Sequence, residues 1–323
     1  MNPTDQNSPA AEPAEQDTDG QATEHAASEG RQPRFRVVEY ALILKPRVMS
    51  LVVFTAWVGL MMAPGTIHLD TAVIAILCIA IGAGASGAIN MWYDRDIDLH
   101  MARTMNRPLP AGRLNPWEAL TFGVVLSIGS VVIMAVSVND LAAILLAATI
   151  LYYVFIYTVW LKRRTPQNIV IGGASGALPP VIGWAAVTGD VGLGAIALFF
   201  IIFLWTPPHT WALALFRRGD YEAAGVPMLP VVAGERETRR QIIIYTVLMI
   251  LSTAVPVAIS MSGWLYGAGV AIIGMEFFRR AWRMWKTEDE TAARPLFLFS
   301  ILYLFLVFLL LLADQGLTNF LNT

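Results

Sequence analysis

Residues 71–98 read TAVIAILCIAIGAGASGAINMWYDRDID, an uncharged apolar run that ends in a short acidic segment. An α-helix rises about 1.5 Å per residue, so about 20 apolar residues cross the roughly 30 Å hydrocarbon layer of a bilayer. The run has that length, and its first charged side chain is Asp94. We therefore expect a transmembrane helix over residues 71–92 with acidic side chains at its end.

Similar apolar blocks recur along the whole chain. Hydrophobic residues make up 56% and charged residues 14% of the 323 residues, whereas average soluble domains carry about 25% charged residues. This composition excludes a single soluble core and predicts an all-α integral membrane protein, a bundle of about nine transmembrane helices. The expected helices cover residues 45–63, 71–92, 117–137, 141–160, 167–187, 193–214, 241–261, 264–282 and 295–313.

The positions of Lys and Arg predict the orientation of this bundle. All 22 of them precede or open the first expected helix, or follow the second, fourth, sixth or eighth, and none lies in the opposite loops. Positive charge is retained on the cytoplasmic side during insertion. We therefore expect a multi-pass protein of the plasma (inner) membrane with a cytoplasmic N-terminus, an outside C-terminus and its long loops facing the cytoplasm.

The chain ends are expected to lie outside the membrane domain of residues 34–313. Residues 1–33 are polar and poor in large apolar side chains, which predicts a disordered tail, and residues 314–323 form a short C-terminal tail. Cys78 is the only cysteine, which excludes a disulfide framework within one chain. The net charge of -2 gives no support for a nucleic-acid partner.

The acidic segment after the second helix contains three oxygen-bearing side chains spaced four residues apart, Asn90, Asp94 and Asp98. This spacing places them on one face of a helix, where like charges repel by a few tenths of a kcal/mol. A divalent cation reverses the sign of that interaction. Mg²⁺ takes a few carboxylate or amide oxygens and completes its octahedron with water or phosphate oxygens, so we predict a magnesium site here.

Three arginines follow the acidic segment and can donate forked hydrogen bonds to phosphate; they are Arg95, Arg103 and Arg107. Carboxylates and arginines together indicate a site for a metal and a diphosphate. The alternative is a solvated loop whose charges only keep it in the cytoplasm.

A second polar region lies in and after the sixth helix. Pro207 and Pro208 remove backbone donors, so we expect an irregular helix that lines a cavity. His209 follows them, and an ionisable side chain at membrane depth is a functional candidate, with a hydrogen-bonded structural histidine as the alternative. Arg218 and Asp220 in the next loop form another charged cluster on the same side.

A third polar segment follows the fourth helix and contains Tyr157, Lys162 and Asn168. The alternative for this segment is the aromatic and basic belt of an ordinary membrane helix. Small residues in the second and fifth helices, including Gly82, Gly172 and Gly176, favour close helix packing, although they could also leave room for a bulky ligand.

These motifs together resemble the UbiA-type intramembrane prenyltransferases, and more closely the heme-farnesylating branch of that family. The resemblance covers residues 40–313 and rests on Lys45-Pro46-Arg47, residues 90–110, residues 157–184 and the Trp205 to Pro230 segment. The family usually carries a second Asp-rich motif after helix six. This chain departs from that pattern with Pro207, Pro208 and His209, which leaves the ligands of any second metal open.

The resemblance implies that the helices surround a central cavity. It also implies transfer of a farnesyl group from farnesyl diphosphate to a vinyl group of heme b, with addition of water, to give heme O. It implies Mg²⁺ as cofactor, and heme A synthase or cytochrome oxidase assembly proteins as partners. The implied metal ligands are Asn90, Asp94 and Asp98; the diphosphate donors are Arg95, Arg103, Arg107, Lys162 and Arg218; the substrate-binding residues are Tyr157, Asn168, His209 and Asp220. Lys162 and His209 are also expected among the catalytic residues.

Three other functions remain as alternatives. A prenyltransferase of the same architecture could act on a quinone precursor or another aromatic acceptor. Broken helices with buried polar groups also occur in transporters, but polar loops confined to one face favour an enzyme. A heme-handling assembly factor without catalysis has no need for the cluster of Asn90, Asp94 and Asp98.

Overall fold

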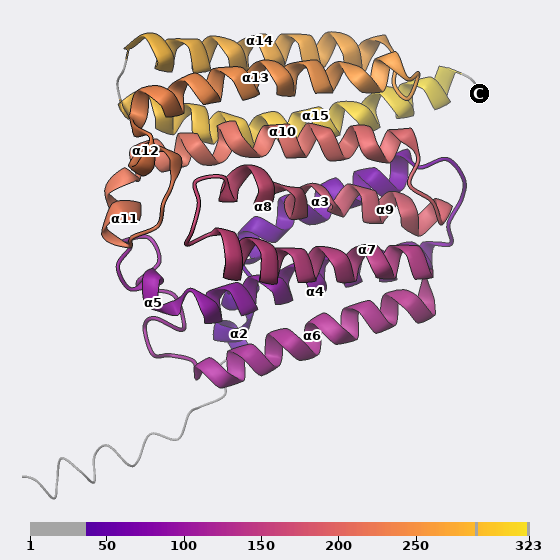
Figure 1. The fold of residues 1–323 in the computed structure, drawn as a ribbon. Helices are drawn as coiled ribbons and strands as arrows, with labels where there is room; N and C mark the ends of the chain where they lie inside the picture. The colour runs from indigo at the N-terminus through magenta and orange to yellow at the C-terminus, as the bar shows by residue number, and fades with distance from the viewer. Residues whose placement is uncertain (1–36, 288–289, 322–323) are drawn as a thin grey trace, which may run out of the picture. The chain divides into compact units, whose positions relative to one another are not determined.

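The computed structural model describes residues 37–287 and 290–321, and every regular element in these ranges is a helix (Figure 1). The predicted disordered tail of residues 1–33 lies outside the described residues. The helices are α2 (Val37–Ile43), α3 (Pro46–Met62), α4 (Leu69–Tyr93), α5 (Arg95–Asp98), α6 (Pro116–Ser137), α7 (Asp140–Leu151), η1 (Tyr152–Leu161), α8 (Asn168–Ala177), α9 (Pro179–Thr188), α10 (Leu193–Phe216), α11 (Arg218–Ala223), α12 (Leu229–Val232), α13 (Gly234–Ala258), α14 (Trp264–Thr287), η2 (Glu290–Ala292) and α15 (Ala293–Leu321).

The described helices confirm a membrane-spanning bundle. Seven helical segments are long and apolar enough to cross a membrane, and an eighth results if α2 and α3, bent by 55° at their junction, count as one span. The predicted segment 264–282 forms α14, whose C-terminal half carries Glu276 and several basic residues and which is not among these spans. The count of nine therefore stays a prediction.

Close contacts between backbones explain several glycines of the bundle. A Cβ on Gly59 of α3 would lie 2.1 Å from the carbonyl oxygen of Pro180 in α9. A Cβ on Gly183 of α9 would lie 2.1 Å from the carbonyl oxygen of Ala56 in α3. Because no side chain fits at either place, the two helices can pack at this distance only with glycine at the crossing.

The irregular helix lies elsewhere than the sequence predicted. Helix α10 continues from Leu193 to Phe216 with Pro207 and Pro208 inside it, so the expected break at these prolines is wrong. Prolines are tolerated in membrane helices because neighbouring groups take over the freed backbone atoms. The irregular segment is η1, a π-helix that continues α7.

The last helix runs past the predicted end of the membrane domain. Helix α15 continues to Leu321, so residues 314–321 are helical. The buried carboxylate of Asp314 accepts hydrogen bonds from the backbone N–H groups of Gly263 and Tyr266, at the start of α14. A carboxylate at a helix N-terminus satisfies orphan N–H groups and the helix dipole, which ties the end of α15 to α14.

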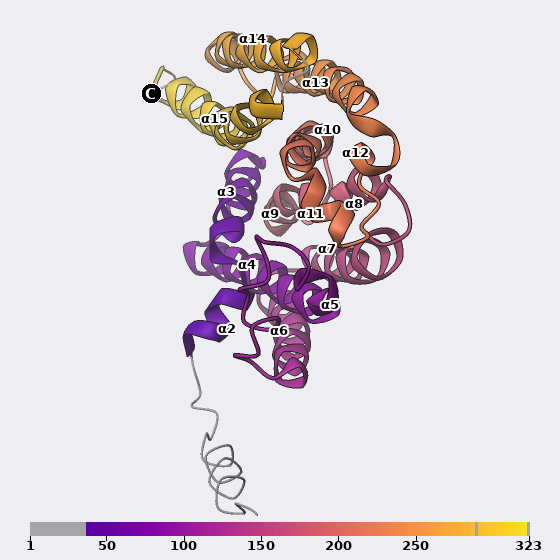
Figure 2. The ribbon, with the colours of Figure 1, turned by 90° about the vertical axis from the view of Figure 1, so that its left-hand side faces the viewer.

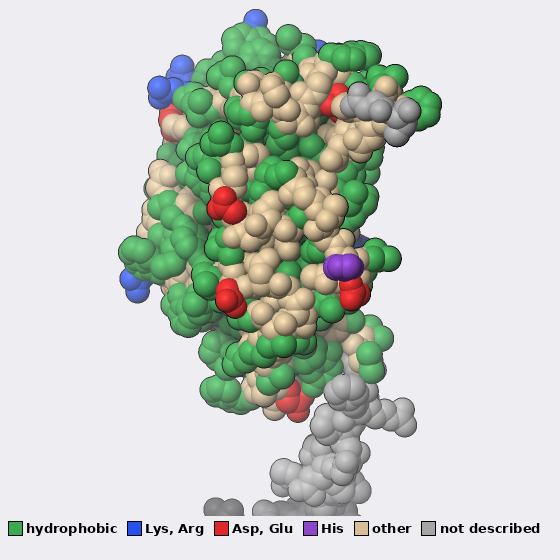
Figure 3. All heavy atoms as spheres, turned by 90° about the vertical axis from the view of Figure 1, so that its right-hand side faces the viewer, with side chains coloured by type: hydrophobic (Ala, Val, Ile, Leu, Met, Phe, Trp, Pro, Cys, Tyr) green, Lys and Arg blue, Asp and Glu red, His purple; other side chains and the backbone are tan. Residues whose placement is uncertain are grey.

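The short helices gather at one end of the bundle. Helices α5, α11 and α12 lie at the left of Figure 1 and face the viewer in Figure 2. The opposite end, shown in Figure 3, displays mainly acidic side chains among its charged groups. The polar segments from the three regions of the sequence therefore meet at a single end of the bundle.

Candidate active site

Asp94 is the centre of a buried network at the end of α4. Its Oδ2 accepts a 2.7 Å hydrogen bond from Nδ2 of Asn90 and a short one from Nζ of Lys162. The guanidinium of Arg163 lies 3.7 Å from its other oxygen, Oδ1. Asp94 is fully buried, so its charge depends on these partners.

Asp98 lies one helical turn further along. Its backbone N–H bonds to the carbonyl of Asp94 at 2.9 Å, just as that of Asp94 bonds to Asn90, so the expected stacking of the three side chains is present. Arg107 donates to Oδ2 of Asp98 at 2.7 Å. The hydroxyl of Thr104 donates to the Asp98 backbone carbonyl at 2.9 Å, which holds the loop against the acidic segment.

Lys45 belongs to this cluster, although the sequence did not place it there. Its Nζ donates to Oδ1 of Asn90 at 2.9 Å. Lys45 lies at the junction of α2 and α3 and has a left-handed backbone with φ 55°. Strained backbone of this kind persists where the surrounding structure fixes it and often marks functional positions. The available signal was the motif Lys45-Pro46 at the start of an apolar block.

The π-helix η1 supplies the opposite wall. The backbone N–H of Lys162 bonds to the carbonyl of Tyr157, five residues earlier, at 2.9 Å. The hydroxyl of Thr158 donates to the Tyr153 carbonyl at 2.9 Å and accepts a bond from Nδ2 of Asn90 at 3.2 Å. The wider turn of a π-helix, a feature frequent at functional sites, thus presents Thr158 and Lys162 to α4.

Tyr157 owes its position to a glycine of α8. A Cβ on Gly172 would lie 2.2 Å from Cδ2 of Tyr157, whereas a Cβ on Gly176 would meet nothing within 4 Å. The Tyr153 and Tyr157 rings lie 5.2 Å apart. Gly172 therefore makes room for a tyrosine of the chain itself, in agreement with the packing interpretation of these small residues.

Two charged groups outside the spanning helices have shifted pKa values. Arg163 donates two hydrogen bonds of 2.7 Å to Asp96, which hold the pKa of that carboxyl below its ordinary value. Burial opposes the charge of Lys162, but its acidic neighbours Tyr157 and Asp94 outweigh burial, so the pKa of Lys162 lies above its ordinary value. Lys162 is therefore a cation at neutral pH.

Two carboxylate oxygens of the acidic segment accept no hydrogen bond and suit a cation. Oδ1 of Asp94 and Oδ1 of Asp98 are both buried and accept no hydrogen bond. In the described residues no three His, Cys, Asp or Glu side chains gather into a metal-binding group, and the oxygen of Asn90 is occupied by Lys45. Two carboxylate oxygens fit Mg²⁺, which takes its remaining ligands from water and phosphate.

The other predicted site residues lie around the Asp94 network or away from it. Arg103 is exposed within electrostatic range of Tyr157, and Nδ2 of Asn168 donates to the Lys162 carbonyl at 3.2 Å. The side chain of Arg95 donates a hydrogen bond to the Trp92 backbone carbonyl at 2.7 Å.

The predicted residues of the second loop lie in other contacts. Arg218 pairs with Glu235 at 3.3 Å, and Asp220 pairs with Arg217 at 3.6 Å. His209 contacts α15, through Ser300 and Phe297.

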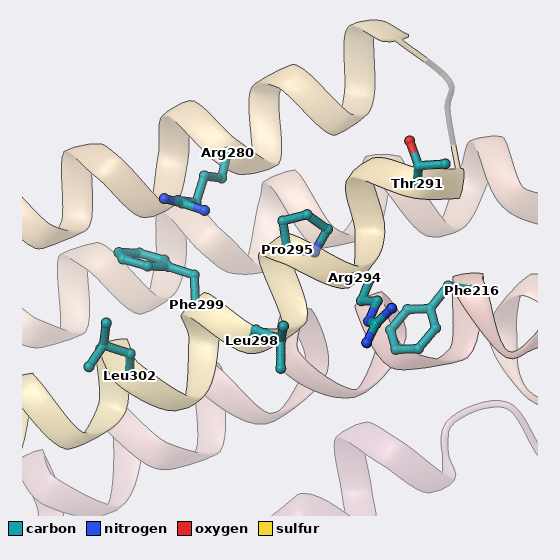
Figure 4. Close-up of a pocket in the computed structure, with 8 residues that line it drawn as sticks. All are labelled: Phe216, Arg280, Thr291, Arg294, Pro295, Leu298, Phe299 and Leu302. Atoms are coloured by element: carbon teal, nitrogen blue, oxygen red, sulfur yellow. The ribbon is translucent and has the colours of Figure 1, made fainter. Parts of the chain in front are cut away.

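A pocket of about 790 Å³ lies away from this network (Figure 4). Phe216 at the end of α10, Arg280 of α14 and residues at the start of α15, including Arg294 and Phe299, line it. None of the acidic residues described above belongs to its lining. The central cavity expected from the sequence stays a prediction.

The profile of the UbiA prenyltransferase family matches residues 51–313, and the chain belongs to this family. Protoheme IX farnesyltransferase of Parvibaculum lavamentivorans is 59% identical over 277 residues, which cover 84% of this chain and 87% of the relative. Protoheme IX farnesyltransferase 2 of Mesorhizobium japonicum is 58% identical over 281 residues, which cover 86% and 90%. The family inferred from the sequence motifs is confirmed.

Solved structures of low sequence identity show the same fold. A structure described for digeranylgeranylglyceryl phosphate synthase has a TM-score of 0.72 and 18% identity, and the match covers 86% of this chain and 98% of that one. A UbiA homologue from Archaeoglobus fulgidus, bound to GPP and Mg²⁺, has a TM-score of 0.59 and 17% identity, with 84% and 99% covered. These likenesses confirm an all-helical, multi-pass membrane fold.

Proposed function

We propose that this chain transfers the farnesyl group of farnesyl diphosphate to a vinyl group of heme b, with addition of water, and releases heme O and diphosphate. The observation that carries the proposal is the cluster in which two buried carboxylates, Asp94 and Asp98, meet the cations Lys162, Arg163 and Arg107. The names of the relatives at 58% and 59% identity support heme as the acceptor.

The cluster provides the groups that a metal and a diphosphate need. Asp94 and Asp98 would hold Mg²⁺ through their Oδ1 atoms, which accept no hydrogen bond. The amide oxygen of Asn90, which accepts from Lys45 in this structure, would be a further ligand if Lys45 donated to a phosphate oxygen instead. Mg²⁺ supplies charge neutralisation to the departing diphosphate, and the Mg²⁺ bound with GPP in the Archaeoglobus homologue supports a divalent ion.

Cationic side chains stabilise the charge that develops as the bond to diphosphate breaks. The allylic C1–O bond of farnesyl diphosphate breaks with its electron pair going to the diphosphate. Lys162, Arg107 and Lys45 are positioned by acidic or amide partners, so they are preorganised donors for this charge. We propose Arg103 as a further donor from the exposed rim, whereas Arg95 and Arg218 must leave their present partners to act.

The farnesyl carbon then forms a bond to the outer vinyl carbon of heme b, and water adds to the inner carbon and releases a proton. Tyr153 and Tyr157 lie next to each other at the cluster, where aromatic faces stabilise allylic positive charge. We propose that Tyr157, Asn168, Asp220 and His209 contribute to binding the substrates.

We place this site on the cytoplasmic side of the plasma (inner) membrane. The support is the confinement of all 22 Lys and Arg residues to one side of the expected spans. Heme A synthase or an oxidase assembly protein would receive the product.

The test is conversion of heme b and farnesyl diphosphate to heme O by the full chain in lipid vesicles, measured by mass spectrometry. We expect heme O only with Mg²⁺, and a loss of about 10²-fold or more in Asp94→Asn. Asp70→Asn, an exposed residue at the other end of α4, is the control and should retain activity. Prenylation of an aromatic acid but not of heme would contradict the heme assignment and support the aromatic-acceptor alternative.

A further inference from the structure

His209 is held on both faces and at one edge of its ring. Trp205 stacks on it with ring centroids 4.2 Å apart, and Phe297 stacks with centroids 4.8 Å apart. At the edge, Nδ1 lies 2.6 Å from the hydroxyl oxygen of Ser300, which is fully buried.

The same serine also fixes the neighbouring tryptophan. The Nε1–H of Trp205 donates to the Ser300 backbone carbonyl at 2.8 Å. The side chain and the backbone of Ser300 therefore hold two adjacent rings of α10 against α15. This arrangement leaves the imidazole little freedom to rotate.

The position of the single hydroxyl proton of Ser300 decides the protonation of His209. The Ser300 hydroxyl lies 2.6 Å from the Phe297 carbonyl. A carbonyl only accepts, so the hydroxyl proton points to it. The hydroxyl oxygen must then accept from His209, whose proton lies on Nδ1. In a neutral imidazole the other nitrogen, Nε2, is consequently an unprotonated acceptor.

The second ring nitrogen of His209 has no partner in the fold. His209 is half-buried, and Nε2 has no hydrogen-bond partner among the described residues. By contrast, Nε1 of Trp211, two residues further along α10, is enclosed and unpartnered. His209 thus keeps one unpaired ring nitrogen, Nε2, while its other edge and both faces are occupied.

We infer that Ser300 is a positioning residue that fixes His209 as the Nδ1–H tautomer so that Nε2 can bind the iron of the porphyrin substrate. Metal-bound histidines generally donate their other ring N–H to a fixed acceptor, and loss of that acceptor lowers metal affinity by about 10- to 100-fold. The Ser300 hydroxyl is such an acceptor. The choice of an iron porphyrin rests on the proposed function, whereas the tautomer rests on the hydrogen bonds alone.

The first experiment measures the tautomer in the wild-type chain. Solid-state ¹⁵N NMR of the full protein in lipid, with histidine labelled and the His209→Gln spectrum subtracted, reports which ring nitrogen carries the proton. The chain has four histidines, so the difference isolates one ring. Protonation at Nδ1 is the expected result, and protonation at Nε2 overturns the inference before any variant of Ser300 is made.

The second experiment compares binding of heme b with binding of metal-free protoporphyrin IX. Ser300→Ala should weaken heme binding about 10-fold or more and shift the heme absorption spectrum, while binding of the metal-free porphyrin stays unchanged. Ser300→Thr keeps a hydroxyl and should restore heme affinity. His209→Gly should lose the iron-dependent part of binding and regain the spectrum when imidazole is added.

The two porphyrins separate coordination from packing. Equal losses for both porphyrins in Ser300→Ala would show a structural role and overturn the inference, as would unchanged heme affinity. If the wild type makes heme O while Ser300→Ala binds heme normally, the proposed function stands and the inference falls. If the wild type binds heme through its iron but makes no heme O, the proposed function falls and the inference stands.

Discussion

The Nζ of Lys45 donates a 2.9 Å hydrogen bond to the amide oxygen of Asn90, which connects the break between α2 and α3 to the acidic end of α4. The amide nitrogen of Asn90 in turn donates to Asp94 and to Thr158. Asn90 therefore links a lysine, a carboxylate and the π-helix through hydrogen bonds. The site thus depends on three separate segments of the chain: the junction of α2 and α3, the end of α4, and η1.

Lys45→Met should remove a diphosphate donor and leave the amide oxygen of Asn90 without its hydrogen-bond donor. We expect kcat/KM for farnesyl diphosphate to fall by about 10²-fold, the loss typical when one preorganised donor is removed. Lys45→Arg keeps the charge and should lose less. Steady-state kinetics in lipid vesicles measure both, and a Lys45→Met enzyme with unchanged kinetics would exclude Lys45 from the site.

Lys162 should remain charged throughout the working pH range. Its pKa is raised above the ordinary value of 10.5, so the ammonium is fully present below that value and is lost only as the pH rises beyond it. We expect no loss of activity from this group between about pH 7 and 9, and a loss of about 10²-fold in Lys162→Met. Lys162→Arg is the control. An alkaline fall below pH 9 that Lys162→Arg abolishes would show that Lys162 titrates there.

The sequence predicted the parts of the site that depend on local spacing. Asn90, Asp94 and Asp98 share one face because i to i+4 spacing on a helix needs no tertiary information. Lys45 and Thr158 join them only through packing of distant segments, which no local pattern encodes. The sequence also did not predict the π-helix η1, because its hydrophobic residues suit an α-helix equally well.

The prolines of α10 led to a wrong prediction of an irregular helix. Pro207 and Pro208 lower helix propensity in the sequence, yet both are buried in a continuous helix. Packing against neighbouring helices outweighs the local cost in this case. Sequence reasoning thus identified His209 as a candidate but gave no indication that Ser300 and Phe297, about 90 residues later, surround it.

The Asp96 and Arg163 pair should contribute modestly to stability. The pKa of Asp96 is depressed from its ordinary value of 3.8 by the two hydrogen bonds from Arg163, so the stabilisation is present above that value and is lost as the pH falls through the depressed pKa. Asp96 is 60% exposed, so we expect Asp96→Asn to cost less than about 1 kcal/mol at neutral pH.

The measurement for this pair is the denaturation midpoint in detergent at neutral pH and near pH 3. Asp96→Asn should lower the midpoint at neutral pH and approach the wild type at low pH, with Asp70→Asn unchanged at both. A deficit that grows as the pH falls would contradict the assignment, because the wild-type carboxylate is then losing its charge.

Gly172 and Gly176 of α8 form a matched pair for testing the wall of the site. A Cβ on Gly172 would lie 2.2 Å from the Tyr157 ring, so Gly172→Ala must push that ring or separate α8 from η1. Overpacking of this kind costs about 1–3 kcal/mol, and displacement of Tyr157 next to Lys162 should also lower kcat. A Cβ on Gly176 meets nothing within 4 Å, so Gly176→Ala should leave both the denaturation midpoint and the kinetics near those of the wild type. Equal effects of the two substitutions on heme O formation would show that the position of Tyr157 does not matter for the reaction.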